Sequence, residues 1–264
     1  MIFARLRRIG AGGGRRRSDA SAEPAPQTSA LAGDVPGPLP QRDELRAMLL
    51  AALLLGCAAV HLWLLGLVHA GLLQDLDLAI HAWVAAHRVP ALTTVAVNFT
   101  ALGSMTLLSA ASALVTLLLW TGRRRLAAVD AALAPILAAL TTALLKRTMG
   151  RPRPPFDEFL ARATAFAEAT GYSFPSGHAS GIAALLTTIA LHTMEATASR
   201  GQRWVLGIFH ALMLLAVGGS RVYLGVHYAS DVLAGLCLGV ACGLAVHGLV
   251  RTHLIVGYLR RRVR

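Results

Sequence analysis

Long apolar runs recur along this chain and restrict its possible folds more than any other feature. A bilayer core requires about 20 apolar residues per helix, and shorter helices are tolerated where neighbours compensate. Over 264 residues the mean hydropathy is +0.59, with 55% hydrophobic and 14% charged residues, which is more apolar than a soluble domain. The sequence therefore predicts an integral membrane protein.

Six segments are apolar enough to be predicted as membrane spans, which gives an all-α, polytopic membrane helix bundle with about six transmembrane helices. The fourth and fifth are the shortest. The segments are Leu45–Gly71, Leu102–Trp120, Leu126–Leu145, His178–Met194, Trp204–Gly219 and Ser230–Val250.

The ends of the chain differ in composition from this membrane domain, which we place at residues 44–254. Residues 1–43 are rich in Arg, Gly, Ser, Ala and Pro and contain no apolar run long enough for a signal peptide. We expect them to form a disordered basic tail, with a lipid-binding basic arm as the alternative. Residues 255–264 form a second basic tail.

The arginines predict which way the chain crosses the membrane. With six spans, four arginine clusters fall on one side, and cytoplasmic loops carry the excess of Lys and Arg, so both termini are predicted to be cytoplasmic. The net charge of +12 then indicates orientation rather than nucleic-acid binding. The clusters are Arg5, Arg7, Arg8 and Arg15–Arg17; Arg123–Arg125; Arg200 and Arg203; and Arg260–Arg262 with Arg264.

The segment Leu73–Pro90, after the first span, has an apolar and a polar face at helical spacing. This pattern predicts a helix that lies on the outer interface and ends at Pro90, or an extension of a neighbouring span. The apolar face contains Leu76, Ile80, Trp83 and Val84, and the polar face contains Asp75, Asp77, His81 and Arg88.

Cations follow the third span, on the predicted outer side, in the sequence KRTMGRPRP at Lys146–Pro154. A cationic cluster on that side breaks the positive-inside pattern, and an anion that the protein must hold would explain it. The alternative is a belt of cations whose charged ends reach the interface.

The fourth span begins with PSGH, Pro175 to His178. Ser176 and Gly177 occupy the N-cap and first-turn positions, where backbone N–H groups have no intrahelical partner, so the helix start can hold an anion. His178 stands beside it as a proton donor or acceptor. An ordinary polar helix cap is the alternative.

Between the fifth and sixth spans lies SRVYLGVHYASD, Ser220 to Asp231. His227 and Asp231 are one helical turn apart, so the carboxylate can accept from one ring nitrogen and leave the other as a nucleophile or base. Arg221 adds a charged fork suited to phosphate oxygens. A histidine that only caps the last span is the alternative for this loop. All three loops face one compartment, and together their groups fit phosphoryl transfer.

The three motifs, K-x6-R-P, P-S-G-H and S-R-x5-H-x3-D, are similar in order and spacing to the signature of the type-2 phosphatidic acid phosphatase superfamily, and the chain resembles its membrane lipid phosphatases. The resemblance covers roughly residues 146–231. RPRP supplies two Arg-Pro pairs, and only Arg153 keeps the six-residue gap from Lys146, so Arg153 is favoured over Arg151.

The resemblance implies a role for each matched residue. His227 would attack phosphorus to form a phosphohistidine, Asp231 would orient it, and His178 would protonate the leaving group. The phosphate oxygens would be held without a metal or other cofactor. The residues that would hold them are Lys146, Arg153, Ser176, Gly177 and Arg221.

The function that follows is hydrolysis of a lipid phosphate or diphosphate at the extracytoplasmic face of a bacterial inner membrane. The substrate is left open among polyprenyl diphosphate, phosphatidate and phosphatidylglycerol phosphate, and so is the oligomeric state; no nucleic-acid partner is expected. Alternatives are a lipid phosphotransferase, a vanadium-dependent haloperoxidase, and a catalytically silent transporter or scaffold.

Five further histidines lie within or near the ends of spans and are expected to be interfacial or internally bonded rather than ligands. Asp130 and Pro135, in the third span, are expected to mark a kink or an interhelical contact. The histidines are His61, His69, His192, His210 and His247.

Overall fold

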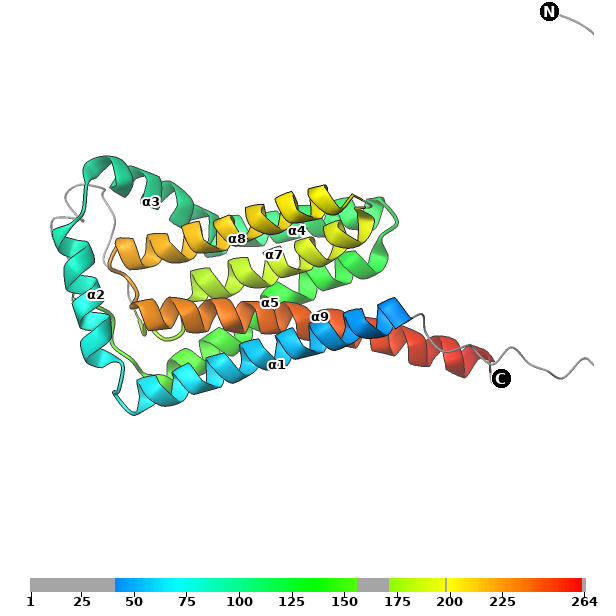
Figure 1. Cartoon of the computed structure of the whole chain (residues 1–264), viewed down its shortest axis with the longest axis horizontal. Helices are drawn as coiled ribbons and strands as arrows, with labels where there is room; N and C mark the ends of the chain where they lie inside the picture. Colours follow the sequence, from blue (N-terminus) through cyan, green and yellow to red (C-terminus); the bar gives the residue numbers. More distant parts are fainter. Residues whose placement is uncertain (1–40, 156–170, 198, 263–264) are drawn as a thin grey trace, which may run out of the picture. The chain divides into compact units, whose positions relative to one another are not determined.

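The computed structural model describes residues 41–155, 171–197 and 199–262, and the side chains of residues 43–155, 171–197 and 199–252. Helices and short connections account for all of these ranges, which confirms the all-α prediction (Figure 1). Nearly all of the predicted tail 1–43 lies outside them. The helices are α1 (Gln41–His69), α2 (Gln74–Ala86), α3 (Pro90–Leu102), α4 (Met105–Thr121), α5 (Arg125–Met149), α7 (Gly177–Ala196), α8 (Arg200–Tyr223) and α9 (Ala229–Arg262).

Each predicted span coincides with a helix, namely α1, α4, α5, α7, α8 and α9. Within the described ranges, α1, α5, α8 and α9 are long and apolar enough to cross a membrane, and α3 with α4, bent by 51°, could form a fifth span. Helix α7 does not meet this criterion, and its residues Ala179–Leu185 are all buried, so it has less need of a lipid-facing surface. Six spans and cytoplasmic termini therefore remain predictions.

Helix α7 packs so closely against α9 that its neighbour carries glycine at the contact. A Cβ at Gly239 would lie 2.2 Å from the Ser180 carbonyl oxygen, and one at Gly235 would lie 2.6 Å from the Ser176 carbonyl oxygen. Small residues let helix backbones approach to this degree. This contact places the start of α7 beside the start of α9.

The segment after α1 departs from the predicted helix in two ways. Asp77 of α2 is buried while Leu76 and Trp83 are 58% and 64% exposed, so part of the polar face turns toward the protein and part of the apolar face turns away from it. The prediction that Pro90 ends this helix is wrong, since α2 ends at Ala86 and Pro90 opens α3, which the apolar pattern did not predict. Proline fits a first turn because its fixed φ suits a helix and no N–H is needed there.

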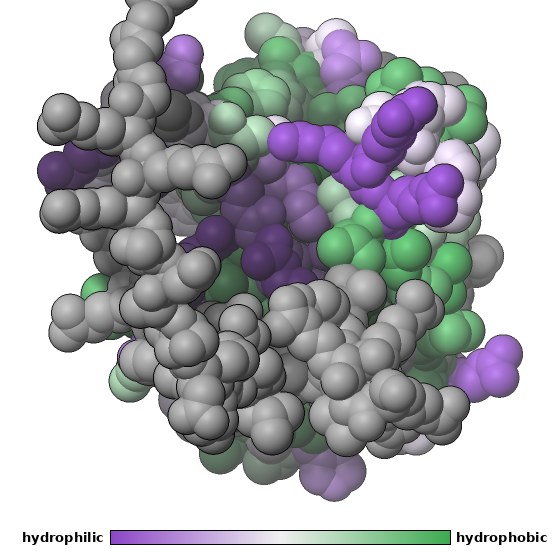
Figure 2. All heavy atoms as spheres, turned by 90° about the vertical axis from the view of Figure 1, so that its right-hand side faces the viewer, coloured by the Kyte–Doolittle hydropathy of each residue, from purple (hydrophilic) through white to green (hydrophobic). Residues whose placement is uncertain are grey.

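Two ends of the bundle can now be distinguished. At the motif end, α5 and α8 end and α7 and α9 begin, and α2 crosses this end (Figure 1). At the arginine end lie Arg123 and Arg124, between α4 and α5, Arg125, at the start of α5, and Arg200 and Arg203, at the start of α8. Figure 2, which looks onto the arginine end, shows hydrophilic side chains gathered on it.

Candidate phosphoryl-transfer site

The end of α5 brings the first motif to the motif end of the bundle. Gly150 has the left-handed backbone conformation (φ 59°) and donates its N–H to the Lys146 carbonyl oxygen at 3.1 Å, which closes the helix and turns the chain. Lys146 Nζ donates to the carbonyl oxygens of Tyr172 and Ser173. Lys146 therefore lies beside the loop that leads into α7.

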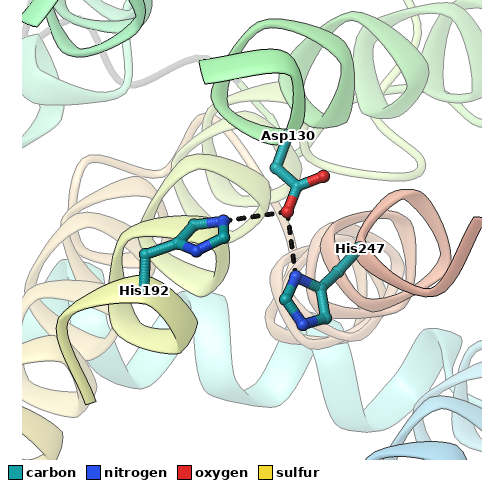
Figure 3. A group of neighbouring side chains, drawn as sticks. All are labelled: Asp130, His192 and His247. Atoms are coloured by element: carbon teal, nitrogen blue, oxygen red, sulfur yellow. Dashed lines mark hydrogen bonds and ion pairs between the residues drawn. The ribbon is translucent and has the colours of Figure 1, made fainter. Parts of the chain in front are cut away.

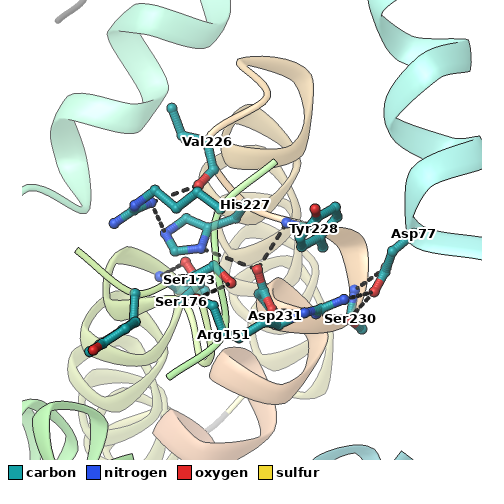
Figure 4. Close-up of polar contacts among 12 residues, drawn as sticks. Asp77, Arg151, Ser173, Ser176, Val226, His227, Tyr228, Ser230 and Asp231 are labelled. Atoms are coloured by element: carbon teal, nitrogen blue, oxygen red, sulfur yellow. Dashed lines mark hydrogen bonds and ion pairs between the residues drawn. The ribbon is translucent and has the colours of Figure 1, made fainter. Parts of the chain in front are cut away.

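The two arginines of RPRP have different surroundings. Arg151 is 7% exposed and forms ion pairs of 2.7 Å with both Asp77 and Asp231 (Figure 4). Arg153 is less buried, and its Nη1 lies 2.6 Å from the Val226 carbonyl oxygen and 3.3 Å from His227 Nε2. Arg153 is thus the arginine next to the predicted nucleophile, while Arg151 lies behind Asp231.

The start of α7 supplies the second motif. Ser176 is fully buried and accepts from the Ala179 N–H at 3.5 Å, as an N-cap does. Its own N–H donates to the Asp231 carbonyl oxygen at 3.0 Å, so this amide is not available to an anion, contrary to the sequence-based expectation. The Ser176 hydroxyl, the Gly177 amide and the positive end of the helix remain to hold one.

His227 lies in the loop between α8 and α9, and Asp231 in the first turn of α9. His227 Nδ1 is 3.5 Å from Asp231 Oδ2, which is longer than an ordinary hydrogen bond. A guanidinium can only donate, so the contact of Arg153 with Nε2 makes Nε2 the unprotonated nitrogen. This is the tautomer that a nucleophilic Nε2 requires.

Electrostatics keep His227 neutral. Burial, together with the charges of Arg221 and Arg153, lowers the pKa of His227 from 6.5 to about 4 against the opposing effect of Asp231. Burial also lowers the pKa of Arg153, yet an arginine stays charged at neutral pH. An uncharged imidazole surrounded by cations is suited to attack an anionic phosphate.

Two side chains that the motifs did not single out support the site from other helices. Asp77 of α2 accepts from Arg151 and from both the N–H and the hydroxyl of Ser230. Thr100 of α3 accepts from Arg221 Nη1 at 2.6 Å. The polar face of the segment Leu73–Pro90 was a signal for Asp77, whereas Thr100 lies in a helix that the apolar pattern did not predict.

An apolar cavity of about 690 Å³ opens beside these groups. Lys146, Gly177 and His178 line it near the site. The rest of its wall comes mostly from α4 and α5, and it extends along these helices from the site as far as Thr116 and Ala132. At 1.5 Å per helical residue, the length from Lys146 to Ala132 is about 21 Å. The phosphate-binding groups thus adjoin a long apolar space.

Comparison with known proteins agrees with this geometry. Residues 127–254 match the PAP2 superfamily. This region is a PAP2 superfamily domain. It contains all three motifs, and the resemblance inferred from them is confirmed. This match and the phosphatase names of the relatives support phosphate monoester or diphosphate hydrolysis.

Relatives of this PAP2 domain include membrane phosphatases. The chain is 29% identical over 183 residues to phosphatidylglycerophosphatase B of Bacillus subtilis (strain 168), which covers 69% of this chain and 86% of the relative. It is 43% identical over 70 residues to an undecaprenyl-diphosphatase of Sulfolobus acidocaldarius, or 26% of this chain and 30% of the relative. A crystal structure of a transmembrane PAP2-type phosphatidylglycerolphosphate phosphatase from Bacillus subtilis superimposes with a TM-score of 0.67 at 26% identity, covering 75% of this chain and 96% of the other.

Proposed function

We propose that this PAP2 domain hydrolyses a lipid phosphate or diphosphate through a phosphohistidine on His227, at the outer face of the membrane. The observation that carries the lipid assignment is the apolar cavity that begins at Lys146 and His178. Its walls suit a hydrocarbon chain, while the cations and the start of α7 suit the phosphate. Phosphatidylglycerol phosphate and polyprenyl diphosphate are the first candidates, because the relatives' names describe such substrates.

The first chemical step is attack on phosphorus. His178 acts in its protonated form, which the negative charge of a bound phosphate stabilises. His227 Nε2 forms the N–P bond as the bond from phosphorus to the leaving oxygen breaks, and protonated His178 gives its proton to that oxygen and becomes neutral. Asp231 faces Nδ1 and stabilises the charge that the ring acquires. Arg153 releases Nε2 and, with Lys146, binds the phosphoryl oxygens as negative charge develops.

The second step restores the enzyme. Water attacks phosphorus and gives a proton to His178, and the N–P bond breaks, which releases inorganic phosphate and a neutral His227. The described side chains supply the acid, base, nucleophile and cations that both steps need, so we expect turnover to continue in EDTA.

The chemistry is tested by phosphate release from the purified protein in detergent with EDTA, using phosphatidylglycerol phosphate, polyprenyl diphosphate and phosphatidate. His227→Ala should lose at least about 10³-fold in kcat, since nothing else replaces the nucleophile. His87→Ala is the matched control, because His87 is exposed and bonds to the Trp83 carbonyl oxygen of its own helix. Full activity in His227→Ala would refute the mechanism.

The lipid assignment needs a separate test. Ala139 lines the cavity, whereas Leu137, on the same helix, does not. We expect Ala139→Trp to raise KM for a long-chain lipid phosphate while leaving a soluble short-chain phosphate of the same headgroup unaffected, and Leu137→Trp to change neither. Equal effects of Ala139→Trp on both substrates would argue against a chain in this cavity.

A further inference from the structure

Three buried polar side chains meet at the arginine end of the bundle, on three different helices. Asp130 of α5 is 1% exposed, and its Oδ2 lies 2.8 Å from His192 Nε2 and 2.9 Å from His247 Nδ1 (Figure 3). The structure thus confirms an interhelical contact at Asp130 and internally bonded histidines. These contacts connect α5, α7 and α9.

This cluster is remote from the proposed catalytic groups. On each of its three helices, the cluster residue is 14 or 16 positions from a residue of the catalytic site, which corresponds to about 21–24 Å along the helix. The mechanism therefore does not explain it. The pairs are Asp130 with Lys146, His192 with His178, and His247 with Asp231.

Two buried polar atoms of the cluster lack a hydrogen-bond partner. Among the described residues, neither Asp130 Oδ1 nor His247 Nε2 has a hydrogen bond, although both atoms are buried. Leaving a charged oxygen unsatisfied inside a protein costs roughly 1–3 kcal/mol or more, so such atoms require an explanation. A cation bound by this carboxylate would provide one.

A second carboxylate faces the other side of both rings. Glu195 Oε2 lies 3.6 Å from His192 Nδ1, and Glu195 Oε1 lies 3.9 Å from His247 Nε2. Arg46 and Arg251 form ion pairs with Glu195 and hold it in place. Histidines that bind metals usually donate the other ring N–H to a carboxylate or carbonyl, which is the position that Glu195 occupies.

We propose that Asp130, His192 and His247 bind one divalent transition-metal ion, with Zn²⁺ as the best match. Two imidazole nitrogens and one carboxylate suit such ions, whereas Mg²⁺ and Ca²⁺ prefer oxygen ligands. With bonds of about 2.1 Å in tetrahedral geometry the ligand atoms lie about 3.4 Å apart. The two nitrogens then need to move only about half an ångström from Asp130 Oδ2.

Binding requires no loss of protons from the site. The ring nitrogens that now donate to Asp130 become ligands, and each proton moves to the outer nitrogen, where Glu195 accepts it. The ion fixes three helices to one another and leaves a fourth position for water. Glu195 is 21% exposed, so the ion can reach the cluster from the arginine end of the bundle.

The test uses the full-length, untagged protein in detergent, stripped with EDTA and titrated with Co²⁺, whose visible absorption bands report coordination; Zn²⁺ then competes. We expect one ion per chain, its loss in His192→Gln and in His247→Gln, and about 10–100-fold weaker binding in Glu195→Gln. His210→Gln is the matched control, since this buried histidine of α8 bonds to the Leu206 carbonyl oxygen of its own helix.

The outcomes separate this site from the catalytic one. His227→Ala should bind the ion normally, and the stripped wild-type protein should still release phosphate. X-ray absorption of the Zn²⁺-loaded wild type should show two imidazole ligands, a result that depends on no variant. Failure of the wild type to bind either ion, absence of imidazole ligands, or unchanged binding in both histidine variants would overturn the proposal.

Discussion

Replacing Asp77 by Asn tests whether α2 helps to build the catalytic site. The Asp77 side chain is 3% exposed and pairs with Arg151, which is also the partner of Asp231. Breaking a buried ion pair costs about 3–5 kcal/mol. Because Arg151 keeps Asp231 and Asn keeps an oxygen for Ser230, we expect the lower end, about 3 kcal/mol, which corresponds to a Tm lower by roughly 6–12 °C.

Activity should fall together with stability. A displaced Arg151 reorients Asp231 and hence His227, while the phosphate-binding cations are untouched, so we expect kcat to fall about 10-fold with little change in KM. Thermal unfolding and phosphate release, both in detergent, measure the two effects. The control is Asp75→Asn, an exposed carboxylate on the same helix. If the two variants have the same Tm and kcat, Asp77 does not support the site.

Three further predictions concern the site and its packing. Protonation of the buried His227 blocks attack, so kcat/KM should fall as the pH drops through about 4, the pKa of His227. A fall centred near pH 6.5 would show that burial does not control this pKa. Arg153→Ala should abolish phosphate release with little change in Tm, whereas Arg151→Ala should lower both, and identical behaviour of the two variants would contradict the separate roles. Gly239→Ala should cost about 1–3 kcal/mol of unfolding free energy through overpacking against α7, while Gly66→Ala, with open space at its Cβ, should cost nothing; thermal unfolding compares them.

The helices and the motif residues could be predicted from the sequence because their causes are local. A bilayer requires long apolar runs, and each of the six that were predicted is a helix. Ser176 opens a helix because its hydroxyl caps the helix start, and His227 and Asp231 are close because four residues make about one turn. Helix α3 was missed because its apolar stretch is short and follows a proline that was interpreted as a stop.

The tertiary structure alone decided which polar groups pair with one another. Arg151 joins Asp77 and Asp231 from 74 and 80 residues away, and Asp130 meets histidines 62 and 117 residues away. Helical periodicity shows that a residue lies on a polar face, but it carries no information about the residue on another helix that it will meet. That pairing depends on how the helices pack, which here depends on the close contact of α7 with the glycines of α9.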